Sequence, residues 1–249
     1  MAIAVELVAH RGHAALCPEN TLEALDSAVA AGARWIEIDV QLCAGGVPVL
    51  LHDADLQRVA GRPESVFDLD PAALAGISVG EPDRFGRRFA SARVPTLATF
   101  AAWLARRPGV SAFVEFKLQS IAHFGRDVVL EACRRALEPV TGRWAPVSFD
   151  RDILVMARAA GLEELGWVVR GHDELIDEAA RSLPARWLFC NKRYLPPGPL
   201  PAGPWDWVVY EVPDAETAQA LAARGARWLE TFAVGAVREA LRGEVVPAA

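Results

Sequence analysis

Short apolar runs alternate with longer segments of helical periodicity along most of the sequence, and this alternation constrains the fold more than any other feature. An apolar run followed by a helix is the unit of a parallel sheet, because parallel strands need a crossover of about a dozen residues or more. Nine runs have the length and composition of strands: residues 5–10, 35–40, 47–53, 112–117, 146–149, 166–170, 187–191, 207–212 and 228–231.

One of these runs does not suit a parallel sheet. Residues 47–53 follow the strand at residues 35–40 after a short connection that ends in Gly45-Gly46. The connection is too short for a crossover, and a pair of glycines favours a hairpin. We therefore expect residues 47–53 to fold back antiparallel, which returns His52 to the face that carries Glu37.

The eight remaining strands give the count of a (β/α)8 TIM barrel, an α/β fold of about 250 residues. A single barrel domain is therefore expected over residues 1–249, with the β-hairpin and a short insertion at its catalytic face. The insertion, residues 58–92, has weak periodicity and one expected helix near residues 71–77. Five prolines between residues 194 and 205 exclude a helix there and indicate a stiff, extended crossover.

Polar residues that can cap helices mark several of the expected helix starts. Asn20 and Glu23 have the spacing of a capping box in front of an apolar helical face. A further helix is expected to begin near Asp173. Three other expected helices follow a residue whose side chain accepts hydrogen bonds from free backbone N–H groups: Thr96, Asp150 and Asp214.

The charge balance and the cysteines bear on partners and compartment. A formal net charge of −6 argues against broad binding of nucleic acid or of an anionic membrane. No apolar run reaches the roughly 18 residues of a membrane span, and no signal-peptide pattern precedes the first strand. The four cysteines are scattered, as in proteins of a reducing compartment. We expect a cytoplasmic protein that acts on a small molecule, with an oligomeric state that the sequence leaves open.

Charged side chains gather at the ends of the expected strands, where a barrel carries its active site. Carboxylates inside a barrel are costly without a cation, and oxygen ligands favour Mg²⁺ or Ca²⁺ over zinc. Two basic side chains suit an oxyanion, and two histidines can serve as acid and base near neutral pH. Together these groups suit phosphoryl transfer at a phosphodiester. They are Glu37, Asp39, Glu115, Arg11, Lys117, His10 and His52.

The order of these motifs resembles the glycerophosphodiester phosphodiesterase family. The resemblance runs from about residue 5 to residue 231, and it includes the last two expected strands, from Val209-Tyr210-Glu211-Val212 to Gly225-Ala226. Six motifs occur in the family's order: His10-Arg11-Gly12, Pro18-Glu19-Asn20-Thr21, Glu37-x-Asp39-Val40, His52-Asp53, Pro95-Thr96-Leu97 and Glu115-x-Lys117.

The resemblance implies a metal-dependent barrel enzyme that cleaves glycerophosphodiesters to glycerol 3-phosphate and an alcohol. It implies that Glu37, Asp39 and Glu115 hold the divalent ion, and that Arg11 and Lys117 contact the phosphate. The implied mechanism uses His52 as base and His10 as acid, or the reverse. The glycerol 2-hydroxyl attacks phosphorus to give a cyclic phosphate, which water then opens.

Several further residues are candidates for the site or its surroundings, and some positions depart from the family pattern. The candidates for supporting or pocket-lining roles are Glu19, Asn20, Asp53, Phe149, Trp207 and Glu211. Gly12 is expected to allow a sharp backbone turn beside the phosphate. The family's hairpin turn usually reads Thr-x-Asp-Gly, where this chain has Cys43-Ala44-Gly45-Gly46. Thr231 is followed by Phe232, where the family often has Asp.

Two alternatives stay open at this point. One is a related barrel diesterase of the lysophospholipase D type, which would act on lysophospholipids. The other is a barrel that binds a phosphodiester without turning it over. The alcohol head group and the choice between Mg²⁺ and Ca²⁺ also stay open.

Overall fold

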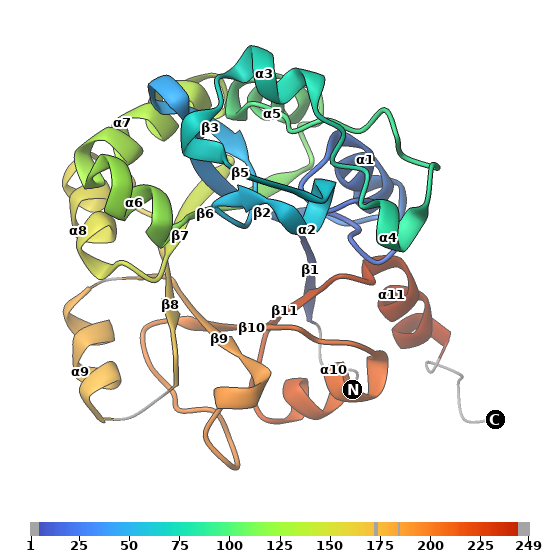
Figure 1. Cartoon of the computed structure of the whole chain (residues 1–249). Coiled ribbons are helices and arrows are strands. Elements are labelled where there is room, and N and C mark those ends of the chain that lie inside the picture. Colours follow the sequence, from blue (N-terminus) through green and yellow to red (C-terminus); the bar gives the residue numbers. More distant parts are fainter. Residues whose placement is uncertain (1–4, 172–173, 184, 244–249) are drawn as a thin grey trace.

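Eight parallel strands form a closed barrel in the computed structural model, which describes residues 5–171, 174–183 and 185–243. The first strand pairs with both the second and the last, which closes the cylinder and confirms the predicted TIM barrel (Figure 1). The strands are β1 (Glu6–His10), β2 (Trp35–Cys43), β6 (Ser111–Phe116), β7 (Trp144–Ser148), β8 (Gly166–Val169), β9 (Trp187–Asn191), β10 (Asp206–Tyr210) and β11 (Trp228–Thr231).

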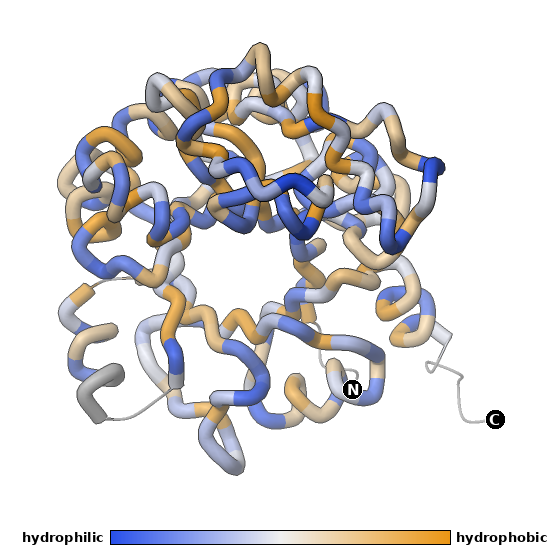
Figure 2. The backbone as a smooth tube through the Cα atoms, in the orientation of Figure 1, coloured by the Kyte–Doolittle hydropathy of each residue, from blue (hydrophilic) through white to orange (hydrophobic). Residues whose placement is uncertain are grey.

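Helices surround the barrel, and most of them carry both hydrophobic and hydrophilic residues along their length (Figure 2). This pattern is typical of helices with one face on a core and one in water. No helix in the described part of the chain is long and apolar enough to cross a membrane. The helices are α1 (Leu22–Ala30), α5 (Leu97–Ala105), α6 (Leu118–Phe124), α7 (Arg126–Leu137), α8 (Arg151–Ala159), α9 (Glu174–Ser182), α10 (Ala215–Ala223) and α11 (Val234–Gly243).

The predicted caps Thr96, Asp150 and Asp214 are confirmed, since each accepts a hydrogen bond from a backbone N–H of the helix that it precedes. The expected capping box at Asn20 is wrong. Thr21 caps α1 instead, by accepting from the backbone N–H of Ala24, and Asn20 adopts a left-handed φ of 56°. The predicted helix start at Asp173 lies outside the described residues.

A stack of aromatic side chains fills the interior of the barrel near the N-terminal ends of its strands. Trp35, Phe113, Trp187 and Trp228 contact one another with ring centroids 4.6–5.9 Å apart. Because side chains alternate along a strand, the residues further along the same inward face stand above this stack, towards the C-terminal ends. The stack is therefore the floor beneath the barrel mouth, which is the open end of the barrel at the C-terminal ends of the strands.

The predicted hairpin is present. β3 (Val47–Leu50) runs antiparallel to β2, and the turn between them passes through Gly45 and Gly46, with φ of 78° and 74°. The insertion that follows lies over one side of the barrel mouth (Figure 1). Its apolar side chains, which include Leu56 and Leu74, pack in one cluster with Cys43 of β2 and Val49 of β3. The insertion comprises β4 (Asp55–Leu56), α2 (Gln57–Ala60), β5 (Arg62–Ser65), α3 (Pro71–Gly76) and α4 (Pro82–Phe85).

The helix expected near residues 71–77 is confirmed as α3. The β4–β5 hairpin was not expected, because its strands of two and four residues are too short to show a period of two. Beyond the short turn at Lys192–Tyr194, the proline-rich connection contains no helix between residues 195 and 205, as predicted.

The turn after β1 should be intolerant of a side chain at Gly12. Its φ is 79°, and a Cβ there would lie 2.7 Å from the carbonyl carbon of Ala24. Gly12→Ala should therefore lower the free energy of unfolding by about 1–2 kcal/mol for the left-handed backbone and by about 1–3 kcal/mol for the clash. Gly45→Ala is the matched control, because its φ of 78° is similar and no atom lies within 4 Å of the added Cβ. Urea unfolding should show the larger loss for Gly12→Ala, and equal losses would contradict the packing argument.

Candidate active site

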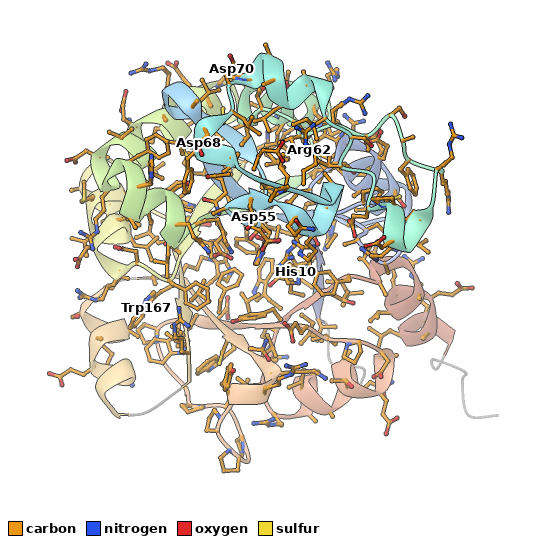
Figure 3. All side chains as sticks on the ribbon, in the orientation of Figure 1. His10, Asp55, Arg62, Asp68, Asp70 and Trp167 are labelled. Carbon is orange, nitrogen blue, oxygen red and sulfur yellow. The ribbon has the colours of Figure 1, made fainter. Side chains whose placement is uncertain are left out.

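Strand register brings the predicted charged residues to one end of the barrel. His10 on β1 is the register partner of Glu37 on β2, and Asp39 on β2 is the partner of Glu115 on β6. These positions share the inward face with the aromatic floor below them. Figure 3 shows His10 at the barrel mouth, with Asp55 and Arg62 of the insertion beyond it.

A cavity of about 210 Å³ opens at this end of the barrel. Its polar wall includes His10, Arg11, His52 and Lys117, and its apolar wall includes Phe149, as predicted for that residue. Trp207 was predicted to line the same pocket, and this prediction is wrong. The alternation of β10 turns Trp207 outwards into the core between barrel and helices, where its Nε1 donates to the carbonyl of Pro201 at 2.8 Å.

Asp39 is the centre of a buried network of opposite charges. The Nε atom of Arg11 lies 3.0 Å from one carboxylate oxygen, and the Nζ atom of Lys117 lies 3.1 Å from the other. Lys117 also donates to Glu115 at 2.9 Å. Burial alone would raise the pKa of Asp39, but Lys117 and Arg11 hold that pKa well below its usual value. Asp39 therefore stays ionised, and the two cations are fixed at the cavity wall.

Asn20 and Glu19 support this network from the loop before α1. The amide of Asn20 donates to Asp39 at 2.9 Å and accepts from the backbone N–H of Asp39 at 3.1 Å. The left-handed conformation of Asn20 is what turns its side chain towards β2 instead of towards its own helix. Glu19 accepts from Arg11 at 3.1 Å and thereby holds the guanidinium in place.

Two further buried carboxylates form no ion pair with a lysine or arginine among the described residues. Glu37 is 3% exposed and Glu230 is 2% exposed, and one oxygen of each, Oε1, makes no hydrogen bond. Burial raises the pKa of both, and neighbouring carboxylates raise it further. The site contains four buried or half-buried carboxylates, Glu37, Asp39, Glu115 and Glu230. Arg11 and Lys117 offset two of these negative charges. The two that remain equal the charge that one divalent cation would neutralise.

The donor set fits such a cation. One oxygen from each of Glu37, Asp39 and Glu115 lies within 4.8 Å of the others, which makes an all-oxygen cluster. Hard oxygen ligands suit Mg²⁺ or Ca²⁺. The unpaired Oε1 of Glu37 is the observation that favours a missing positive partner, because an orphaned buried carboxylate oxygen is strongly unfavourable.

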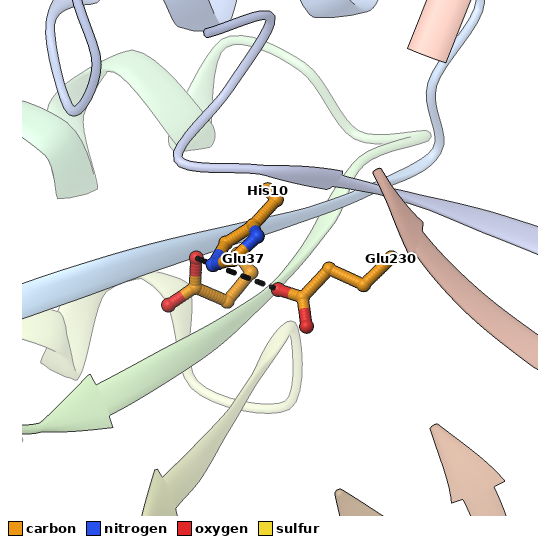
Figure 4. Close-up of side chains that lie close together, drawn as sticks. All are labelled: His10, Glu37 and Glu230. Atoms are coloured by element: carbon orange, nitrogen blue, oxygen red, sulfur yellow. Dashed lines mark ion pairs between the residues drawn. The ribbon is translucent and has the colours of Figure 1, made fainter. Parts of the chain in front are cut away.

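His10 is clamped by its neighbours. Its ring stacks on Phe232, with centroids 4.3 Å apart and planes 8° from parallel. Its Nε2 atom lies 3.8 Å from Glu37 and 3.9 Å from Glu230, between the two carboxylates (Figure 4). Burial, and then the charge of Arg11, lower the pKa of His10. The Phe232 departure from the family pattern thus supplies the surface that orients this imidazole.

His52 is held by a carboxylate, as in a catalytic dyad. Its Nδ1 atom lies 2.7 Å from Asp53, and Arg58 pairs with the other oxygen of Asp53 at 2.7 Å. The hydrogen bond from His52 is the main cause that lowers the pKa of Asp53 to about 2. An ionised carboxylate only accepts, so Nδ1 carries the proton and the Nε2 atom of a neutral His52 has a free lone pair.

Some residues of the site escaped the sequence reasoning. Glu230 follows Trp228 on the inward face of β11, and the alternation that identified Glu37 applies to it equally. Arg58 and Glu81 lie in the insertion, where no pattern marks them. Arg58 pairs with Glu19 at 2.7 Å, and Glu81 accepts from the backbone N–H of Glu19 at 2.7 Å. The predicted candidate Glu211 lines the cavity in a left-handed conformation, with φ of 62°.

Comparisons with known proteins show what this chain is similar to. A glycerophosphodiester phosphodiesterase of Caldanaerobacter subterraneus subsp. tengcongensis is 37% identical over 91 residues, which cover 36% of this chain and 37% of that protein. Glycerophosphodiester phosphodiesterase 1 of Bos taurus is 33% identical over 93 residues, 37% of this chain and 28% of that protein. The matched segments thus span about a third of these curated relatives.

A solved structure shares the whole architecture. An Oleispira antarctica phosphodiesterase, in complex with the product sn-glycerol-3-phosphate, superposes with a TM-score of 0.84 and 22% identity over 96% of this chain and 97% of that one. At this identity the likeness supports the fold. The family model described as "Glycerophosphoryl diester phosphodiesterase family" matches residues 10–160, which include every predicted catalytic and metal-binding residue. Because that model covers more than half of the sequence, the chain belongs to the glycerophosphoryl diester phosphodiesterase family.

Proposed function

We propose that residues 1–249 act as a single barrel domain that hydrolyses glycerophosphodiesters to glycerol 3-phosphate and an alcohol, with Mg²⁺ or Ca²⁺. The observation that carries the proposal is the cavity that brings both histidines together with Arg11, Lys117 and Glu37. The sn-glycerol-3-phosphate named as product in the Oleispira antarctica structure supports the assignment of the product. Four buried free cysteines support the proposed cytoplasmic location.

Arg11 and Lys117 are proposed to bind the phosphate. Both are buried cations at the cavity wall, held in place by Asp39. An anion between them meets charge-assisted hydrogen bonds in a site of low dielectric, where such bonds are strongest. Glu37, Asp39 and Glu115 would hold the divalent cation, whose positive charge would stabilise the charge that develops on the phosphoryl oxygens.

His52 is proposed as the base and His10 as the acid of the first step. The Nε2 atom of His52 takes the proton of the glycerol 2-hydroxyl, whose oxygen attacks phosphorus, while His10 protonates the leaving alcohol. Water then opens the cyclic phosphate, with the roles of the two histidines reversed. The anchoring of His52 by Asp53 supports the base role. Burial is the main cause that lowers the pKa of His10, and the charges of Arg11 and Lys117 lower it further; a bound phosphate would offset those two charges.

Alanine at either histidine should lower kcat by about 10²–10⁴, because general acid–base catalysis typically contributes that factor. His10→Ala and His52→Ala are compared with His123→Ala, which removes an exposed histidine stacked on Phe67 outside the cavity. Release of glycerol 3-phosphate from glycerophosphocholine is the measurement. Full activity in His10→Ala would contradict the two-histidine mechanism.

Removal of divalent metal with EDTA should abolish turnover, and added Mg²⁺ or Ca²⁺ should restore it. The same ions should raise Tm, because they offset the repulsion among Glu37, Asp39 and Glu115. In Glu37→Gln one ligand and its charge are lost, so the metal-dependent rise in Tm should shrink. Turnover that persists in metal-free enzyme would exclude the proposed cofactor.

A small substrate should be preferred over a lysophospholipid. The cavity of about 210 Å³ accommodates a glycerophosphodiester of small alcohol, whereas an acyl chain would need apolar surface outside it. We expect kcat/KM for glycerophosphocholine to exceed that for lysophosphatidylcholine by about tenfold or more, which corresponds to roughly 1.4 kcal/mol. The reverse order would indicate the lysophospholipase D type, and tight binding of both without turnover would indicate a binding protein.

A further inference from the structure

Glu230 is a buried carboxylate that the proposed reaction does not use. It lies on β11, on the far side of β1 from Glu37, and both carboxylates approach the imidazole of His10 (Figure 4). Its Oε1 atom makes no hydrogen bond within the described residues. A carboxylate at 2% exposure without a donor is unfavourable in the free protein, so its surroundings favour a cation.

The three side chains have the geometry of an incomplete metal site. One atom from each of His10, Glu37 and Glu230 lies within 4.8 Å of the others. The Nε2 atom of His10 is 3.8 Å from Glu37 Oε2 and 3.9 Å from Glu230 Oε1. Ligands on one tetrahedral zinc ion stand about 3.4 Å apart at bond lengths of about 2.0–2.2 Å. Shifts of a few tenths of an ångström would therefore close these two pairs around an ion.

The ligand types distinguish this group from the all-oxygen cluster beside it. An imidazole nitrogen with two carboxylates is a donor set for Zn²⁺, whereas Mg²⁺ and Ca²⁺ prefer oxygen alone. Divalent zinc also binds such sites far more tightly than the hard cations do. Glu37 belongs to both groups, so an ion in one of them alters the other.

We propose that His10, Glu37 and Glu230 form a Zn²⁺ site whose occupancy inhibits the enzyme. The inhibitory part rests on the proposed function, since an imidazole nitrogen bonded to zinc can no longer carry the proton of the leaving alcohol. The binding part stands independently of it. The reaction is reversible coordination of a metal ion by a neutral imidazole and two carboxylates, without any redox change.

Zinc binding to the EDTA-treated, dialysed protein tests the site directly. Zn²⁺ is titrated in saturating Mg²⁺ against a chromophoric chelator, for wild type, Glu230→Gln and Glu211→Gln. Substitution of residues that only surround a metal site typically weakens metal binding by about 10–100-fold. Loss of a ligand itself should therefore weaken zinc binding by at least this factor. Glu211→Gln removes a carboxylate of the same cavity that lies outside the group, so its zinc affinity should equal that of wild type. Equal zinc affinity of wild type and Glu230→Gln would overturn the proposal.

Two further measurements keep binding and inhibition apart. Co²⁺ in wild type should give the visible absorption of a low-coordinate site with a nitrogen ligand. If the spectrum is only the weak one of six oxygen ligands, the site is contradicted. This measurement uses wild type alone, so it holds even if Glu230→Gln fails to fold. In the Mg²⁺-activated reaction, the inhibitory Zn²⁺ concentration should rise in Glu230→Gln by the factor found for binding. Zinc that binds through Glu230 without inhibiting would overturn the inhibitory role, and an inactive wild type would overturn the proposed function but leave the binding test intact.

Discussion

The mouth of the barrel contains more buried carboxylates than the lysine and arginine side chains of the described residues pair with, and much of the site depends on this imbalance. Bringing an ion out of water costs several kcal/mol even after the protein relaxes, so buried carboxylates persist only with partners. Arg11 and Lys117 supply those partners for Asp39 and Glu115. Glu37 and Glu230 have no lysine or arginine partner within the described chain, and burial and neighbouring carboxylates raise the pKa of both.

The barrel makes this concentration of charge possible because its register is fixed from below. The inward aromatic rings of β2, β6, β9 and β11 pack against one another, and a slip of one residue in any of these strands would turn its aromatic ring outwards. Packing of the floor thus sets the height and direction of the groups above it. The polar residues of the mouth are placed by apolar residues that do not line the cavity.

Most of the fold and the centre of the site follow from periodicity in the sequence. Alternation along β2 was enough to place Glu37 and Asp39 on one face, and the short glycine connection was enough to predict the β2–β3 hairpin. The errors have physical causes. Asn20 resembles a helix cap, but its left-handed backbone directs it to Asp39. Trp207 lies near a strand end, but the alternation of side chains along β10 points it out of the barrel. Arg58 reaches the site from a segment that is too irregular to show any periodic pattern.

The insertion has a consequence for how the two histidines are coupled. His10 stands on the barrel wall, whereas His52 follows the hairpin and is held by Asp53, which in turn accepts a hydrogen bond from Arg58 of the insertion. Glu19 links the barrel to the insertion through Arg58 and Glu81, and Arg84 adds a further link by donating to the carbonyl of Ala14. The proposed acid–base pair therefore depends on the insertion as well as on the barrel, because contacts from both position its two histidines.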